Sequence, residues 1–173
     1  MRKISKYIIL LIFIAFSFCT LNGNTVYAVN VPNEVKLAAE SGLVIFKNMV
    51  SENPNNYGYL NLDEVNKTVL GDGFKIKYVN PNKLKKSDNE SLSELVDDTN
   101  CWEFIALVDG KPKSFITIGK INGEYKLIQF GGNPEKFYNS FKKYNNTDDK
   151  NLEPQIIKMG NENWLIINNN IYA

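Results

Sequence analysis

Three apolar-rich segments, separated by two turns, form the clearest pattern of hydrophobic and polar residues in this chain. Asn122 and Gly123 lie between the second and third segments, and this pair is a specific signal for a β-hairpin because both residue types tolerate positive φ. Residues 109–112 (Asp-Gly-Lys-Pro) form the other turn. The pattern therefore predicts a three-stranded antiparallel meander. Its strands are residues 101–108, 113–120 and 124–130.

The first of these strands carries apolar side chains on both of its faces, because successive residues of a strand point to opposite sides. One face has Trp102, Phe104, Ala106 and Val108, and the other has Ile105 and Leu107. A sheet with one solvated face usually alternates more regularly than this. We therefore expect the protein's own elements to cover both faces. The alternative is one partly open face that takes a partner.

Two other segments show the spacing of amphipathic helices. The first begins at residues 32–34 and ends near Ser51, with apolar residues three and four positions apart. The second follows Pro134, which suits the first turn of a helix, and runs to about Tyr144.

Shorter elements occupy most of the remaining chain. Asn61 or Asp63 can cap a short helix that runs through Leu70, with Val69 facing inward and a turn at residues 71–73. Three further expected elements are a half-exposed strand at residues 74–79, a brief helix at residues 91–98 and a hairpin of residues 155–159 and 164–167.

The order of these elements indicates an α+β fold, because the regular strand–helix alternation of parallel crossover units is missing. We expect a single domain over residues 29–173, with helices packed on one face of a mainly antiparallel sheet. A helix laid across a curved sheet resembles the layout of cystatin-like and PepSY-like modules. The resemblance is one of layout alone, since no motif of either family is matched by residues of this chain.

The N-terminus has the order of an export signal. A basic start precedes an apolar run at residues 8–18, and a polar stretch then leads to a small-residue pattern that ends at Ala28. We therefore expect a secreted bacterial protein whose mature form begins at Val29. The run is shorter than the about 20 apolar residues that a membrane span needs. The alternative is an uncleaved leader that anchors the protein in the membrane through residues 7–21.

Composition excludes several kinds of chemistry. The chain has no histidine, so Ser-His-Asp triads, Cys-His pairs and histidine metal sites are impossible. After the expected cleavage Cys101 is the only cysteine, which rules out an internal disulfide and a multi-cysteine zinc site. Cleavage also leaves 17 basic against 19 acidic residues without a basic stripe, so nucleic acid is not expected as a partner. We expect no metal and no cofactor.

Loops supply the candidate binding residues, because loops carry function more often than the elements that they connect. Tyr57 and Tyr59 flank a glycine in an irregular link, and among the aromatic residues they are the best candidates for exposed contact residues. A binding surface would be formed by this loop and two others, or by an edge of the sheet. The candidate residues are Tyr57, Tyr59, Asp109, Gly131, Gly132 and Asn133.

These observations favour a secreted, non-catalytic binding module with a protein, a peptide or the cell envelope as its partner. The alternative is an extracellular hydrolase that needs no histidine, such as a glycosidase with two carboxylates. Glu103, Glu124 and Asp72 are the first candidates for that chemistry. The adjacent acidic pairs at residues 97–98 and 148–149 indicate solvated charge instead, because neighbouring side chains diverge.

Overall fold

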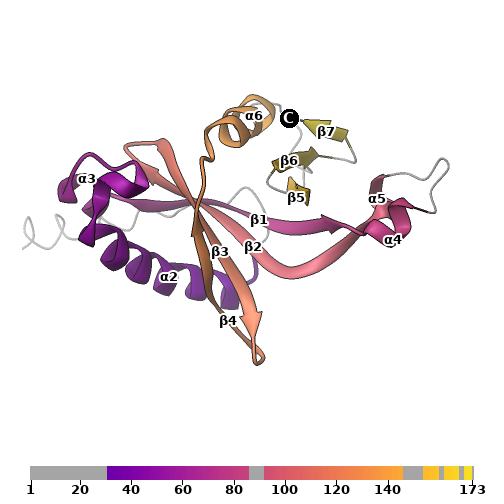
Figure 1. Ribbon diagram of the computed structural model, residues 1–173, viewed down its shortest axis with the longest axis horizontal. Helices are drawn as coiled ribbons and strands as arrows, with labels where there is room; N and C mark the ends of the chain where they lie inside the picture. Colours follow the sequence, from indigo (N-terminus) through magenta and orange to yellow (C-terminus); the bar gives the residue numbers. More distant parts are fainter. Residues whose placement is uncertain (1–30, 86–91, 146–153, 160–161, 168–169, 173) are drawn as a thin grey trace, which may run out of the picture.

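The computed structural model describes residues 31–85, 92–145, 154–159, 162–167 and 170–172. Its strands are β1 (Val69–Val79), β2 (Val96–Val108), β3 (Lys111–Ile121), β4 (Glu124–Gly131), β5 (Gln155–Met159), β6 (Glu162–Ile167) and β7 (Asn170–Tyr172). They form one sheet in the order β4-β3-β2-β1-β5-β6-β7, in which only β1 and β5 pair in parallel (Figure 1). The predicted α+β class with a mainly antiparallel sheet is confirmed. The expected export signal and the acidic pair at residues 148–149 lie outside the described residues.

Helix α2 (Asn33–Glu52) covers one face of the sheet and begins after Pro32, as predicted. Its buried residues recur at helical spacing: Val35, Ala39, Gly42, Phe46 and Val50. Gly42 allows the helix to approach the sheet closely, because a Cβ at this position would lie 3.2 Å from Ile118 Cδ1. No helix among the described residues has the length and apolar character needed to cross a membrane.

Helix α3 (Leu62–Asn66) is capped by Asn61, one of the two expected caps, whose side-chain oxygen accepts a hydrogen bond from Glu64 N at 2.9 Å. The prediction that this helix continues through Leu70 is wrong. Strand β1 already begins at Val69, whose side chain is exposed and does not face inward.

The predicted turn at residues 71–73 is also wrong, because both glycines lie inside β1. A Cβ on Gly73 would lie 2.6 Å from Phe104 Cε1, and one on Gly71 would lie 2.7 Å from Leu107 Cδ1. Each glycine thus leaves room for a large side chain of the neighbouring strand. A glycine within a strand often marks such a close approach, which the sequence alone does not distinguish from a turn.

Strands β1 and β2 extend together towards the short helices α4 (Pro81–Leu84) and α5 (Leu92–Leu95) (Figure 1). Helix α5 ends earlier than expected because β2 begins at Val96. The predicted meander of β2, β3 and β4 is confirmed. At its two hairpin turns, Asp109 and Asn122 have φ values of 49° and 51° and are each followed by a glycine with positive φ, as two-residue turns require.

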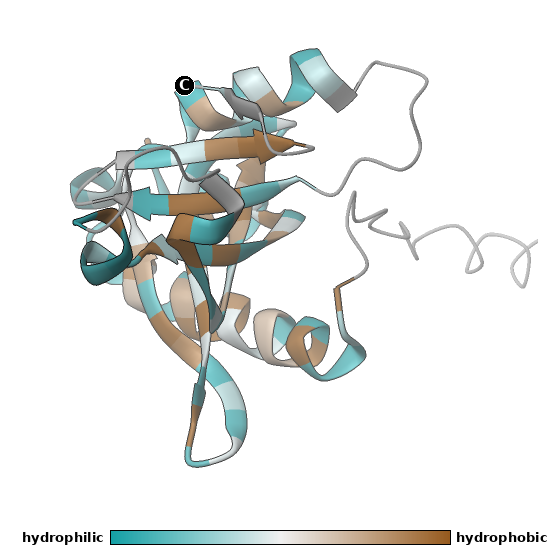
Figure 2. Cartoon of the chain, turned by 90° about the vertical axis from the view of Figure 1, so that its right-hand side faces the viewer, coloured by the Kyte–Doolittle hydropathy of each residue, from teal (hydrophilic) through white to brown (hydrophobic). Residues whose placement is uncertain are grey.

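Helix α6 (Glu135–Asn145) covers the second face of the sheet, so the sheet lies between two helices (Figures 1 and 2). Phe137 and Phe141 pack with Ile105 on this face, whereas Phe104 packs on the α2 side. The expectation that both faces are covered is confirmed. The expectation of helices on one face only is wrong. Successive apolar residues of β2 point to opposite faces of the sheet, so each face has a hydrophobic core that a helix covers.

The C-terminal strands complete the sheet beyond β1. Strand β5 pairs in parallel with β1 and in antiparallel with β6, which confirms the predicted hairpin. Ile156 and Leu165 from this hairpin are buried in the α6-side core. Strand β7 was not expected, since its three residues are too few to show a period.

Candidate functional site

Lys113 ties two of the predicted binding loops together at one end of the sheet. Its Nζ donates a hydrogen bond to Gly58 O at 3.3 Å and lies 2.6 Å from Glu64 Oε1. The same atom lies 5.6 Å from the centre of the Tyr59 ring, whose π face attracts a cation. Because Lys113 stands near the start of β3, these contacts join the loop at residues 57–59 to the β2–β3 turn.

An aromatic contact places the third loop, residues 131–133, next to the other two. The ring centres of Tyr57 and Phe130 are 5.7 Å apart, and Phe130 precedes Gly131 at the end of β4. The sheet register places Gly131 opposite Phe115, on the same strand as Lys113. Three segments that are distant in sequence therefore meet at one end of the sheet. We call residues 57–59, 109–112 and 131–133 the turn-end surface.

The two tyrosines differ in exposure. Tyr57 is 38% exposed, in line with the expectation. Tyr59 is only 1% exposed and packs against the ring of Phe46, so the expectation that it is an exposed contact residue is wrong. Its ring fills the space between α2 and Lys113. Burial raises the pKa of the Tyr59 hydroxyl above its ordinary value, and the charge of Glu64 adds to this rise.

Glu64 is held in place from two sides. Its Oε2 accepts a hydrogen bond from Leu60 N at 2.6 Å, and its Oε1 faces Lys113. The hydrogen bond from Lys113, followed by that from Leu60, holds the pKa of Glu64 below its ordinary value.

Sequence reasoning missed both Glu64 and Lys113. The spacing of Asn61 and Glu64 is that of a capping box and could have pointed to Glu64. No local pattern could have identified Lys113, because its partner Gly58 is 55 positions away in the sequence.

A cavity of about 510 Å³ opens beside the turn-end surface, between the β2–β3 turn and α6. Its volume lies within the range of roughly 300–1,000 Å³ that is typical of ligand sites. Its walls carry charges of both signs together with one buried aromatic ring. The lining residues are Gly110, Lys111, Pro112, Lys113, Glu135, Tyr138 and Asn139.

The segment at residues 131–133 connects the end of β4 to the start of α6. Gly131 and Gly132 have φ values of 124° and 79°, which favour glycine. The side-chain oxygen of Asn133 accepts a hydrogen bond from Glu135 N at 2.9 Å at the start of the helix. These contacts give the three residues a positioning role within the turn-end surface.

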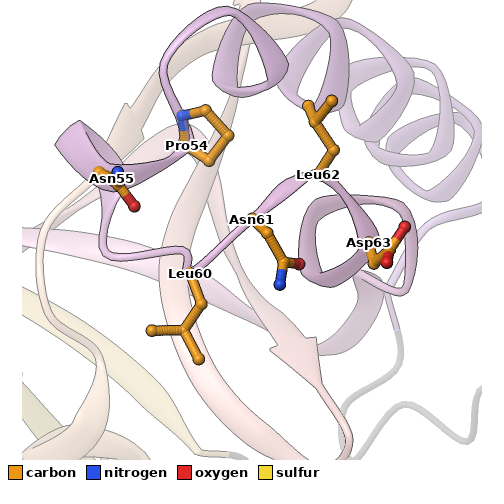
Figure 3. A pocket seen from close by; sticks show the side chains of 6 residues that line it. All are labelled: Pro54, Asn55, Leu60, Asn61, Leu62 and Asp63. Carbon is orange, nitrogen blue, oxygen red and sulfur yellow. The ribbon is translucent and has the colours of Figure 1, made fainter.

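A second cavity, of about 410 Å³, adjoins the link between α2 and α3 (Figure 3). Its walls come from the first two residues of the short 3-10 helix η1 (Pro54–Tyr57) and from residues around the cap of α3. Leu60 and Leu62 project to different sides of this link, and Leu60 is 80% exposed. The cavity thus adds apolar surface close to Tyr57. Its lining residues are Pro54, Asn55, Leu60, Asn61, Leu62 and Asp63.

The three carboxylates proposed for a hydrolase line neither of these cavities. Glu103 is 1% exposed, accepts a hydrogen bond from Thr117 Oγ1 at 2.9 Å and forms an ion pair with Lys158. Glu124 lies at the β3–β4 hairpin, four residues further along β3 from the partner of Glu103, which is roughly 13 Å. Asp72 lies within β1. The structure therefore does not bring Glu103 and Glu124 together.

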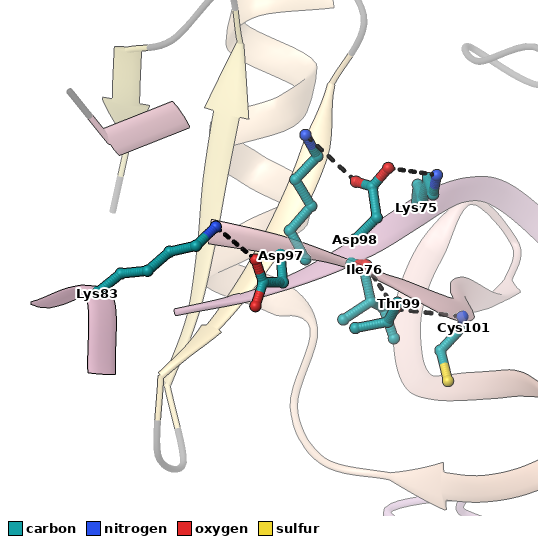
Figure 4. A network of polar contacts seen from close by, with 8 residues as sticks. Lys75, Ile76, Lys83, Asp97, Asp98, Thr99 and Cys101 are labelled. Carbon is teal, nitrogen blue, oxygen red and sulfur yellow. Dashed lines mark hydrogen bonds and ion pairs between the residues drawn. The ribbon is translucent and has the colours of Figure 1, made fainter. Parts of the chain in front are cut away.

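The acidic pair at residues 97–98 forms ion pairs with Lys75 of β1 and Lys83 of α4 (Figure 4). Asp98 lies 3.1 Å from Lys75 Nζ, and Asp97 lies 2.6 Å from Lys83 Nζ. Hydrogen bonds from these lysines hold the pKa of each carboxyl below its ordinary value. Among the described residues, no group of three or more Cys, Asp and Glu side chains is placed to hold a metal ion.

Comparison of the chain with family models, with curated proteins and with solved structures found no match.

Proposed function

We propose that the exported domain is a non-catalytic binding module that contacts a protein or peptide through the turn-end surface. One observation carries this proposal: three loops far apart in the sequence are held at one end of the sheet by the contacts of Lys113 and Tyr57. A rigid scaffold that gathers loops at one end is a common arrangement in binding proteins. Tyr57, Asp109 and Lys111 offer exposed aromatic, acidic and basic groups there.

The loops suit this role better than the β4 edge of the sheet does. Strand β4 is one of the two outer strands of the described sheet, and its register with β3 is interrupted between Thr117 and Ile118. Exposed Lys126 also lies on this strand. Bulges and lysines on an edge strand hinder the addition of another strand.

Secretion is the second part of the proposal, and the order of charges and apolar residues before Val29 supports it. N-terminal sequencing of the protein from culture medium should give a first residue of Val29. An intact leader in the membrane fraction would instead support the anchored alternative.

Capture from medium and cell envelope tests the binding surface, with the tagged chain expressed with its own leader. Tyr57→Ala and Asp109→Lys should each lose a partner that the unaltered protein retains. Tyr78→Ala is the matched control, because Tyr78 is 44% exposed near the end of β1, where it pairs with Asp97 of β2, away from the three loops. Circular dichroism should show that all three variants stay folded. If the protein captured no partner and instead hydrolysed members of a glycan panel, the hydrolase would become the favoured function and the binding module the alternative.

A further inference from the structure

We propose that the cavity between the β2–β3 turn and α6 binds a free amino acid with an aromatic side chain. Its volume of about 510 Å³ is ample for a ligand of this size. Two elements supply its charged side chains: Lys111 is the first residue of β3, and Glu135 is the first residue of α6. The cavity therefore offers a cation to a ligand carboxylate and a carboxylate to a ligand ammonium group.

Lys111 and Glu135 line the same cavity but do not pair with each other. Within the part of the chain that the structure describes, neither side chain forms an ion pair or a hydrogen bond, whereas the neighbouring Lys113 is paired with Glu64. The pKa of Glu64 is lowered chiefly by the hydrogen bond from Lys113, and the charge of Lys111 contributes least to this lowering. Two opposite charges that do not meet are complementary to a ligand that carries the reverse pair, as an amino acid does.

An aromatic ring and a proline supply the apolar part of the cavity wall. The ring of Tyr138 is held in place by Phe141, with ring centres 6.4 Å apart, and by Lys142, whose Nζ lies 5.1 Å from the centre of the Tyr138 ring. Pro112 lines the cavity from the β2–β3 side. Aromatic rings pack favourably against one another in offset or edge-to-face arrangements, so this wall favours an amino acid with an aromatic side chain.

The remaining lining residues suit polar contacts and entry. Asn139 lies four residues after Glu135, on the same side of α6. Its amide can donate to a carboxylate and accept from an ammonium group. At Gly110 the wall is open, because a Cβ built there would meet no atom within 4 Å. A ligand of amino-acid size can therefore enter from the side of the β2–β3 turn.

The proposal does not rest on the proposed function. Tyr57 and Asp109, whose replacement tests the capture of a partner, do not line this cavity. Loss of capture and loss of amino-acid binding are therefore separate results.

A ligand-detected NMR titration tests the site, with protein expressed from the full chain and L-phenylalanine as the probe. We expect a dissociation constant of about 0.1–1 mM, as suits a ligand of this size in an open cavity. Phenethylamine lacks the carboxylate, N-acetyl-L-phenylalanine lacks the ammonium group and glycine lacks the ring, so each should bind about tenfold more weakly or worse. No binding of L-phenylalanine at about 10 mM, or equal binding of the three analogues, would overturn the proposal.

Substitution of the two charged residues assigns each ligand group to its wall. Glu135→Gln should weaken L-phenylalanine about tenfold but leave N-acetyl-L-phenylalanine unchanged, because this analogue has no ammonium group for Glu135 to bind. Lys111→Gln should likewise weaken L-phenylalanine and leave phenethylamine unchanged. Glu124→Gln and Lys126→Gln are the controls, because these residues form an exposed ion pair on β4 and do not line the cavity.

Circular dichroism should show that all four variants stay folded. Equal weakening by the control variants would contradict the site. Loss of N-acetyl-L-phenylalanine binding in Glu135→Gln to the same extent as loss of L-phenylalanine binding would contradict the role of Glu135.

Discussion

Lys113 Nζ and Glu64 Oε1 lie 2.6 Å apart, and their side chains are only 21% and 16% exposed. This ion pair connects β3 to α3 at the end of the sheet where the three loops of the turn-end surface meet. It differs from the pair of Lys126 and Glu124, whose side chains are 54% and 73% exposed. Partial shielding from water makes the first pair a contributor to stability, whereas exposed pairs contribute little.

Replacement of Lys113 should therefore destabilise the protein. Lys113→Met removes the contacts with Glu64, Gly58 O and the Tyr59 ring, and we expect a loss of about 1–2 kcal/mol in the free energy of unfolding. Lys126→Met is the matched control and should change the free energy by less than about 0.5 kcal/mol. Urea unfolding followed by tryptophan fluorescence measures both. Equal effects of the two substitutions would show that the Lys113 contacts add nothing to stability.

The same pair predicts a dependence of stability on pH. The pKa of Glu64 is lower in the folded protein than its ordinary value, so its contribution is present above that ordinary value and is lost as pH falls through the folded pKa. Between about pH 6 and about pH 3, the unaltered protein should lose more stability than Lys113→Met, and the two should converge at the acidic end. Thermal unfolding at several pH values measures this. A constant difference between the two proteins would contradict the assignment to Glu64.

Glu103 and Lys158 give a third prediction, because their ion pair joins β2 to β5 across β1. Lys158→Met leaves the buried carboxylate of Glu103 without its cation, which should cost about 3 kcal/mol. Addition of Glu103→Gln should recover much of this loss, since the amide carries no charge and can still accept the hydrogen bond from Thr117. Chemical unfolding gives the free energy of unfolding of Lys158→Met, of Glu103→Gln and of the double variant, and these values complete a double-mutant cycle with the unaltered protein. Additive losses would show that the two residues are not coupled.

Gly73 gives a fourth prediction about the core. Gly73→Ala places a methyl group 2.6 Å from Phe104 Cε1, and Phe104 is fully buried. We expect a loss of about 1–3 kcal/mol from overpacking. Val69→Ala on the same strand changes an exposed side chain and should have a much smaller effect. A neutral result for Gly73→Ala would mean that Phe104 can move without cost and that the glycine is not needed for close packing.

Local patterns predicted the elements whose signals are contained in a few neighbouring residues. The β3–β4 turn followed from Asn122 and Gly123, since the conformation of a two-residue turn depends on those residues themselves. Helix α2 followed from the spacing of its buried residues. The errors arose where a distant side chain decides the local conformation. Gly73 lies within β1, and it is a glycine there because the ring of Phe104 occupies the space that a side chain would fill.

The candidate site shows the same division. Sequence identified Tyr57, Asp109 and residues 131–133 as loop residues, because turn-forming residues surround them. It could not show that these loops meet, or that Tyr59 is buried, because both facts depend on the position of Lys113 and Phe46 in the folded chain.

The amino-acid sequence by itself determined the α+β class, the antiparallel meander and the impossibility of histidine chemistry, since these follow from short-range periodicity and composition. Only the tertiary structure decided which face each helix covers, which loops form one surface and which apolar residues of α2 stay in solvent. The physical reason is that contacts between residues distant in sequence depend on how whole elements pack. A local pattern of hydrophobic residues fixes which side of an element is buried but not what it is buried against.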